Sequence, residues 1–340
     1  MTGLFAITTR GLEEVAAGEI QRLPGVEVLE RGYRRVAMHA SGPLAALLAL
    51  RTVDDCFLDL ATWRNVPHTR AALTMLAELS RGLDLPRAVS AARSLRSISA
   101  RPSFAVTVNF VGARNYSSDE AKLQIGSAIQ DRLGWVHQLR DDASEVNLRI
   151  FIEHETVHVG LRLAAHPLHE RTYKRQHRPG SLRPPVAAAM VALSGLSAGQ
   201  EMLDPCCGSG TLLVEATHAG ARCRGGDLDD AAVTAARENA AAAGATVGIE
   251  RWDACALPLP DASCDHVICN LPWDRQVEVD AGLRDFHEQI CREISRILRP
   301  NGTATILTIH GDLVHLPGRT RTHAVEISLH GQLPRIICTS

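Results

Sequence analysis

Strands and helices alternate through the second half of the chain, and this alternation limits the possible folds more than any other feature. After residue 185, short apolar runs are separated by stretches of helical periodicity. This alternation is typical of a parallel, doubly wound α/β sheet. The predicted strands are residues 201–204, 221–226, 247–252, 266–270, 304–309, 324–329 and 335–339, and the predicted helices are 186–193, 211–218, 231–243 and 282–298. The last two strands follow each other directly, so we expect the sheet to end in a hairpin.

The first half of the chain is predicted to form two further domains. Residues 1–65 follow the order β-α-β-β-α-β, which is that of a ferredoxin-like unit. Residues 66–165 form a second mixed segment, and residues 166–184 lack periodicity and are interpreted as a linker to a domain at 185–340. Several domains agree with a length of 340 residues, because single hydrophobic cores stop growing at roughly 250 residues. The predicted helices of this half are residues 12–23, 43–50, 71–79 and 119–133.

The charge of the chain is divided unevenly. The formal net charge at pH 7 is −2, yet residues 1–184 carry 24 basic and 19 acidic side chains, while residues 185–340 carry 12 and 19. The two halves therefore have net charges of +5 and −7. A basic half favours a polyanionic partner such as a nucleic acid. Only Lys122 and Lys174 are lysines, so the basic side chains are almost all guanidinium groups, which suit bidentate phosphate contacts.

The linker concentrates this positive charge. Its cationic side chains are Arg171, Lys174, Arg175, Arg178 and Arg183, and one aromatic residue, Tyr173, lies among them. Clustered cations with an aromatic residue suit phosphate contacts and base stacking, so we predict that this segment binds RNA. A solvated connector between domains would have a similar composition, and both interpretations stay open at this point.

A glycine-containing loop follows the first predicted strand of the C-terminal domain. Residues 204–211 read Asp-Pro-Cys-Cys-Gly-Ser-Gly-Thr and open the next helix. Glycines at this place let the backbone approach a ligand and direct the amides of the helix N-terminus toward it. A dinucleotide fingerprint would need a third glycine where Leu213 stands, and the sequence has no Gly-Lys-Ser/Thr phosphate loop. Together with a terminal hairpin, which is typical of class I methyltransferases, the loop fits S-adenosylmethionine.

Acidic residues follow the next two predicted strands. Asp227 lies 19 residues after Gly208, where a carboxylate can accept hydrogen bonds from both hydroxyl groups of a ribose. Asp253 follows the third strand, and we expect it to accept a hydrogen bond from an adenine amino group. Asp227 could instead cap the following helix, although Asp229 or Asp230 could also do so.

A short polar motif follows the fourth strand. Residues 270–273 read Asn-Leu-Pro-Trp. The exocyclic amine of a base is a poor nucleophile, because its lone pair is delocalised into the ring. An Asn oxygen and a backbone carbonyl that accept hydrogen bonds from this amine would direct the lone pair toward a methyl group, and an aromatic side chain would stack on the base. A strand-end turn with a surface Trp is the structural alternative for these four residues.

These motifs, in this order, resemble the THUMP-containing RNA guanine-N2 methyltransferases, notably those that act on the acceptor stem of tRNA. The matching segments are residues 104–163, the linker sequences His169-Glu-Arg-Thr-Tyr173 and Ser181-Leu-Arg-Pro184, the loop at 204–211, Gly226 with Asp227, and residues 270–273. The resemblance implies an α/β protein in which ferredoxin-like (1–65) and THUMP (66–165) α+β domains precede a class I Rossmann-like methyltransferase domain (185–340). It also implies that the THUMP domain binds the end of tRNA.

The resemblance assigns individual residues to the site. S-adenosylmethionine is expected to contact Asp204, Cys206, Gly208, Ser209, Gly210, Thr211, Asp227, Leu228, Asp253, Ala254 and Asn270. The target guanine is expected to contact Asn270, Leu271, Pro272 and Trp273. Two positions depart from the family pattern, since Asp274 stands where relatives often have Gly, and Trp273 stands where they have Tyr or Phe.

Two other motifs are interpreted as structural. Pro205-Cys206-Cys207 resembles a cysteine nucleophile motif, but it lies in the predicted cofactor loop rather than beside a target base, which favours packing. His154-Glu-Thr-Val-His158 matches a zinc-protease pattern that works only on a helix. Here it joins two predicted strands, at 146–152 and 157–161, so we expect a hairpin turn and no metal.

The sequence limits the possible RNA substrates and the cellular location of the protein, but it leaves alternatives for the substrate. We expect tRNA as the substrate, and the alternatives are guanine N2 in rRNA, an amine of adenine or cytosine, or a silent RNA-binding protein impaired at Asp274. No apolar run approaches the roughly 20 residues that span a bilayer, and no secretory signal is visible. Nine cysteines without a Cys-x-x-Cys pair also favour the cytoplasm. The sequence does not indicate an oligomeric state.

Overall fold

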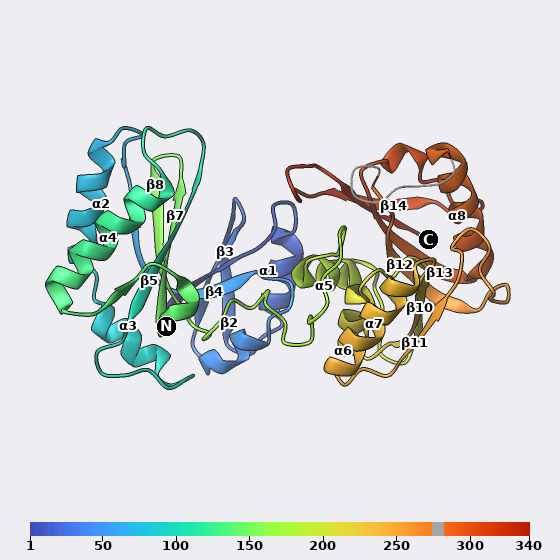
Figure 1. Ribbon diagram of the computed structural model, residues 1–340, viewed down its shortest axis with the longest axis horizontal. Coiled ribbons are helices and arrows are strands. Elements are labelled where there is room, and N and C mark those ends of the chain that lie inside the picture. Colours follow the sequence, from blue (N-terminus) through green and yellow to red (C-terminus); the bar gives the residue numbers. More distant parts are fainter. Residues whose placement is uncertain (274–281) are drawn as a thin grey trace. The chain divides into compact units, whose positions relative to one another are not determined.

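The computed structural model describes residues 1–273 and 282–340, and it divides into two compact units. Residues 1–8 and 17–168 form the first unit, and residues 9–16 and 169–340 form the second. Figure 1 traces both in sequence colours. No helix among the described residues is long and apolar enough to cross a membrane. Asp274, which departs from the family pattern, lies outside the described residues.

The first unit is built on one sheet of eight strands in the order β2-β3-β1-β4-β8-β7-β5-β6. Strands from residues 1–65 and from residues 66–165 share this sheet, because β4 and β8 pair antiparallel. Helices α2 and α4 pack together beside β5, β7 and β8 (Figure 1). The strands are β1 (Thr2–Ile7), β2 (Val26–Gly32), β3 (Arg35–Ala40), β4 (Asp55–Trp63), β5 (Phe104–Val111), β6 (His137–Gln138), β7 (Val146–Glu153) and β8 (Thr156–Arg162). The helices are α1 (Glu13–Gln21), η1 (Leu44–Ala49), α2 (Ala71–Arg81), α3 (Leu85–Ala92), α4 (Ser118–Leu133) and η2 (Asp141–Ala143).

Local sequence explains where these helices begin and end. Ser117 and Glu120 form a capping box at the start of α4, and Gly134 ends the helix in the left-handed conformation. The predicted helix at 43–50 is a 3₁₀ helix instead, at Leu44–Ala49. Helix α3 was not predicted, although Asp84 caps it by accepting a hydrogen bond from the backbone N–H of Arg87. It is only eight residues long and follows α2 closely, so its helical periodicity could not be recognised in the sequence.

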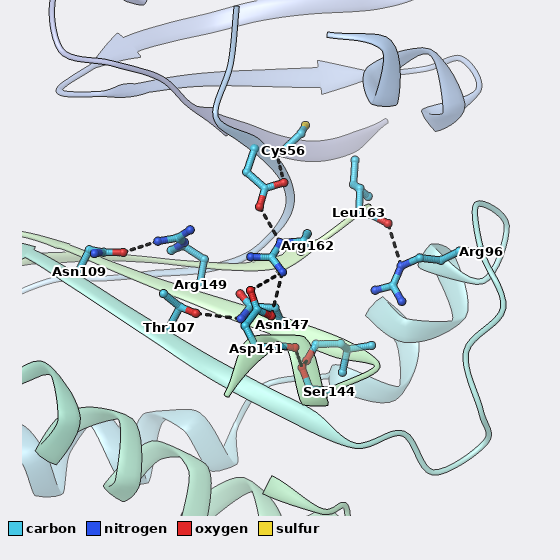
Figure 2. Close-up of polar contacts among 12 residues, drawn as sticks. Cys56, Arg96, Thr107, Asn109, Asp141, Ser144, Asn147, Arg149, Arg162 and Leu163 are labelled. Carbon is cyan, nitrogen blue, oxygen red and sulfur yellow. Dashed lines mark hydrogen bonds and ion pairs between the residues drawn. The ribbon is translucent and has the colours of Figure 1, made fainter. Parts of the chain in front are cut away.

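Several arginines of the first unit are used inside it. The guanidinium of Arg162 lies 2.6 Å from a carboxylate oxygen of the buried Asp55 and 2.7 Å from Asp141. Arg149 donates a hydrogen bond to Asn109, and Arg96 donates to the carbonyl of Leu163 at 3.1 Å (Figure 2). Three of the basic side chains counted in the first half are therefore engaged inside the unit, so the count of 24 basic residues overstates the number that an RNA could contact.

The second unit contains a sheet of seven strands in the order β11-β10-β9-β12-β13-β15-β14. The first five are parallel, and β15 runs antiparallel to both β13 and β14. This confirms the predicted doubly wound sheet with a terminal hairpin. The strands are β9 (Glu201–Asp204), β10 (Arg222–Asp227), β11 (Val247–Arg251), β12 (Cys264–Asn270), β13 (Leu298–Thr308), β14 (Arg321–Glu326) and β15 (Arg335–Thr339). The helices are α5 (Pro184–Leu193), α6 (Thr211–His218), α7 (Asp230–Ala242), α8 (Leu283–Ile297) and η3 (Gly311–Leu313).

A segment from the N-terminus completes the core of the second unit. Leu12 is fully buried in the same apolar cluster as Ile327 and Leu329. The backbone N–H of Ser328 donates to the carbonyl of Arg10 at 3.1 Å, and a Cβ at Gly11 would collide with the carbonyl of Glu326. The sequence does not indicate this contact, because Leu12 has the helical spacing of the predicted helix at residues 12–23.

Candidate active site

A cavity of about 540 Å³ opens at the carboxyl ends of β9, β10 and β12. Strand β9 lies between β10 and β12 in the sheet, so the chain order reverses at this point, where ligands of open α/β sheets bind. Most residues predicted for the site line this cavity, namely Arg178, Asp204, Cys206, Gly208, Ser209, Thr211, Asp227, Leu228, Asp253, Ala254, Asn270, Leu271, Pro272 and Trp273. The sequence therefore located the residues that the fold brings together.

The loop after β9 is held by hydrogen bonds that its backbone N–H groups donate to neighbouring carboxylates. Asp204 is 1% exposed, and its carboxylate accepts a hydrogen bond from the backbone N–H of Cys206 at 3.2 Å. Gly208 has a φ of +52°, and its N–H donates to Asp227 at 2.9 Å. Gly210, with a φ of +75°, lies instead against α7, where an added Cβ would come within 3.0 Å of the Cβ of Ala236. This glycine serves helix packing behind the loop.

Burial shifts the pKa of three ionisable groups in the loop. Burial raises the pKa of the Asp204 carboxyl, and the nearby Asp227 raises it further. Burial also raises the pKa of the Cys206 and Cys207 thiols. A thiolate is the form that attacks, so these cysteines are poor nucleophiles. This agrees with the packing interpretation.

The strand-end carboxylates have distinct partners. The side chain of Asp227 also accepts a hydrogen bond from the N–H of Asp229, at 3.1 Å. Helix α7 is capped by Asp229, whose carboxylate accepts from the N–H of Ala231 at 2.8 Å. The alternative that Asp227 caps this helix is thereby excluded. Asp253 accepts a hydrogen bond from the N–H of Cys255 at 2.8 Å and faces the cavity.

Asn270, at the end of β12, has a fixed amide and an unused oxygen. Its Nδ2 donates to the carbonyl oxygen of Gly180 at 3.3 Å, which fixes the amide because a carbonyl can only accept. Its Oδ1 is buried and has no partner among residues 1–273 and 282–340. Trp273 is 4% exposed and lines the cavity, and its indole N–H is also buried and unpaired within the described chain.

Two of the linker cations, Arg171 and Lys174, have partners inside the protein. Arg171 lies 3.6 Å from the fully buried carboxylate of Glu215, which also accepts a hydrogen bond from the Tyr173 hydroxyl at 2.7 Å. Tyr173 is itself buried, so the expectation that it stacks on a base is wrong. Lys174 donates to the carbonyl of Leu182 and to the Thr211 hydroxyl.

The remaining linker cations differ in their surroundings. Burial, opposed by the nearby Glu215 and assisted by Arg183, lowers the pKa of Lys174 to about 8. Arg178 pairs with Asp229 at the cavity. The side chain of Arg175 is exposed. Of the five cations, Arg175 is therefore the one whose surroundings best suit an RNA contact.

Several cavity residues escaped the sequence interpretation. Gly180, Ser181 and Leu182 line the cavity from the linker, and Phe286 and Gln289 line it from α8. The hydroxyls of Ser181 and Ser209 lie 2.6 Å apart. Phe286 and Gln289 lie one helical turn apart in the sequence, but helical spacing alone does not distinguish a cavity-lining face from a core-facing one. Ser181 and Leu182 belong to a linker segment that carries the family resemblance, but the sequence did not indicate that this segment reaches the cavity.

The zinc-protease pattern lies on a hairpin, as predicted. Strand β7 ends at Glu153 and β8 begins at Thr156, so His154 and Glu155 form the turn, with a φ of +51° at His154. Histidines in this arrangement do not share the face of a helix. No group of three or more His, Cys, Asp or Glu side chains suited to a metal occurs in the described residues.

Comparisons with known proteins place this site in a family. A model described as the RMKL-like methyltransferase domain matches residues 171–325. The tRNA (guanine(6)-N2)-methyltransferase of Thermus thermophilus is 30% identical over 241 residues, which cover 69% of this chain and 71% of that protein. The crystal structure of TrmN from Thermus thermophilus superposes with a TM-score of 0.80 at 26% identity, over 100% of this chain and 99% of that one.

A further relative differs from the bacterial enzyme in its length and in the substrate that its name gives. The U6 snRNA (guanine-N(2))-methyltransferase THUMPD2 of Mus musculus is 32% identical over 204 residues, covering 59% of this chain. The match spans 37% of the mouse protein. The chain thus corresponds to less than half of that relative, and to most of the bacterial one. With its Rossmann-like domain, the chain belongs to the family of RNA guanine-N2 methyltransferases that includes the Thermus thermophilus enzyme.

Proposed function

We propose that this protein transfers a methyl group from S-adenosylmethionine to the N2 amine of a guanosine in tRNA. The observation that carries the proposal is the side chain of Asn270, whose oxygen is a buried acceptor without a partner in the described chain. An unsatisfied buried acceptor costs about 1–3 kcal/mol. A ligand that donates a hydrogen bond at this point would remove that cost, and the amine of a base is such a donor.

The arrangement around Asn270 supports transfer to an exocyclic amine. Gly180 fixes the amide from the nitrogen side, so the oxygen is held where it can accept from the substrate amine. That hydrogen bond would orient the nitrogen lone pair and supply the positioning that such a weak nucleophile needs. S-adenosylmethionine, when bound, supplies an electrophilic methyl group. Trp273, which lines the same cavity, offers an aromatic surface for the base.

The cavity also fits the cofactor by its chemistry. Two carboxyl groups, Asp204 and Asp227, lie beside the glycine loop and complement a positively charged sulfur. Asp227 uses each oxygen for one hydrogen bond from the backbone, which leaves lone pairs for ribose hydroxyls. Asp253 supplies an acceptor for the adenine amine, and Leu228 and Ala254 supply apolar surface.

We assign RNA binding to the first unit, with a THUMP domain at residues 66–165, and to exposed cations of the linker. The net charge of +5 for residues 1–184 supports this assignment, as does the tRNA substrate named for the Thermus thermophilus relative. A tRNA substrate also agrees with the cytoplasmic location predicted from the sequence.

The proposal is tested with labelled S-adenosylmethionine and separated tRNA and rRNA fractions. We expect label in the tRNA fraction and cofactor binding by calorimetry. Label confined to rRNA would show that rRNA rather than tRNA is the substrate, while leaving the proposed methyl transfer in place. Cofactor binding without label in either RNA would refute methyl transfer to these RNAs. Absence of cofactor binding would support the silent RNA-binding alternative.

A further inference from the structure

Asn239 connects the linker to the glycine loop. It lies on α7 and is fully buried. Its Oδ1 accepts hydrogen bonds from the backbone N–H groups of Arg175 and Gln176, both at 2.9 Å. Its Nδ2 donates to the carbonyl of Gln176 at 3.0 Å and to that of Ser209 at 2.9 Å. All four hydrogen-bonding positions of the amide are therefore used.

These four bonds join two segments that both line the cavity. The partners at residues 175 and 176 belong to the linker, which continues to Gly180 and Ser181. The partner at Ser209 belongs to the loop after β9. A second tie between the same segments is the 2.6 Å contact of the Ser181 and Ser209 hydroxyls. The linker is thus fastened to the glycine loop on both sides of Gly180.

We infer that Asn239 is a positioning residue for the methyl transfer, acting through the linker on Asn270. With residues 175 and 176 fastened, the carbonyl of Gly180 stays within reach of the Asn270 amide, whose oxygen then faces the substrate amine in one orientation. The inference rests on the proposed function, because it names what sets the geometry of the same site. Asn239 itself need not touch the RNA or the cofactor.

A purely structural role for Asn239 would give a different result. In that case its loss would lower the free energy of unfolding, but the folded variant would react at the normal rate. Glu238 provides a matched control, since it precedes Asn239 on α7 and binds the same linker residue. Its carboxylate accepts a hydrogen bond from the side chain of Gln176 at 2.6 Å, at an exposed position.

The experiment compares full-length Asn239→Ala and Glu238→Ala at a temperature where both are folded. Hydrogen exchange read by mass spectrometry should show about fivefold faster exchange in residues 173–181 of Asn239→Ala, because a backbone hydrogen bond is worth about 1 kcal/mol. Single-turnover methylation of tRNA should slow by roughly 10- to 100-fold, the usual effect of a small misplacement. The Kd for tRNA should change less than about twofold, because a residue that only positions another side chain does not contribute directly to substrate binding. Glu238→Ala should match the wild type.

Each result bears on the inference. Unchanged exchange in residues 173–181, an unchanged single-turnover rate, or an equal effect of Glu238→Ala would overturn it. If Asn239→Ala does not fold, Ser181→Ala is measured instead. We then expect slower single-turnover methylation of tRNA, and a rate equal to that of the wild type would contradict the inference. If wild-type protein methylates no RNA, the proposed function fails, and the exchange experiment still decides whether Asn239 fastens the linker.

Discussion

The amide of Asn270 is held by the carbonyl oxygen of Gly180, 3.3 Å from its Nδ2, while its own oxygen has no partner in the described chain. One residue at the end of β12 is thus oriented by a linker that precedes the domain in sequence. The linker contributes to the geometry of the site as well as to its charge. The predictions below follow from this relationship and from the buried groups around it.

Asn270→Asp separates the two functions of the Asn270 side chain. A carboxylate keeps the acceptor for the substrate amine but cannot donate to Gly180, and its second oxygen would face that carbonyl. We expect single-turnover methylation to fall by about 100-fold or more, as for loss of a preorganised transition-state contact, with the Kd for tRNA nearly unchanged. Asn301→Asp, at an exposed position of the same unit, controls for the added charge. Equal loss of RNA affinity and rate would argue against the role assigned to Asn270.

Cofactor affinity should depend on pH through Asp204. Burial raises the pKa of this carboxyl in the free protein, so a bound cation, which favours the ionised form, must displace its proton. Affinity for S-adenosylmethionine should therefore rise with pH above the ordinary range of Asp and level off once the raised pKa is passed. Calorimetry in buffers of different ionisation enthalpy measures the released proton. Asp204→Asn should make the affinity for S-adenosylmethionine independent of pH. An affinity of the wild type that does not change with pH would contradict the role of Asp204.

The cysteines of the loop should resist alkylation. Burial raises the pKa of both Cys206 and Cys207, so the reactive thiolate is scarce at pH 7.5. Iodoacetamide should leave both unmodified in folded protein under conditions that label them fully in urea, as peptide mass mapping would show. Rapid selective labelling of either one in the native protein would reopen the possibility of a cysteine nucleophile.

Linker arginines should separate into a stabilising and an RNA-binding residue. Arg171→Ala removes the guanidinium that lies 3.6 Å from the buried carboxylate of Glu215, and we expect a loss of about 2–4 kcal/mol in the free energy of unfolding, measured in urea. Arg175→Ala removes an exposed cation and should instead weaken tRNA binding. The slope of log K against log[salt] should become less steep by about one. If Arg171→Ala weakens binding without loss of stability, the internal assignment of Arg171 is incorrect.

Much of the second unit was predictable because its signals are local. Strand β9 and helix α6 have the predicted bounds, and the loop between them could be recognised from its own residues. The cavity residues at the carboxyl ends of β9, β10 and β12 followed from one rule, that parallel strands end at the same edge of a sheet. The chemistry of Asn270 was likewise visible in four adjacent residues.

The remaining features depend on contacts between distant residues. Leu12 lies in the core of the second unit, Tyr173 is buried on Glu215, and Asn239 binds a segment more than 60 residues away. Nothing in the sequence near these residues indicates their partners. A linker rich in arginine has the composition of an RNA-binding surface, and only burial shows that Arg171 and Lys174 have partners inside the protein.

The identity of the methylated nucleoside tests the central claim most directly. Transfer RNA incubated with the protein and isotopically labelled S-adenosylmethionine is digested to nucleosides and analysed by mass spectrometry, with Asn270→Ala in parallel. We predict label in N2-methylguanosine for the wild type and none above background for the variant. Label in an adenosine or cytidine derivative, or equal label from Asn270→Ala, would contradict the assignment of guanine N2 and of Asn270.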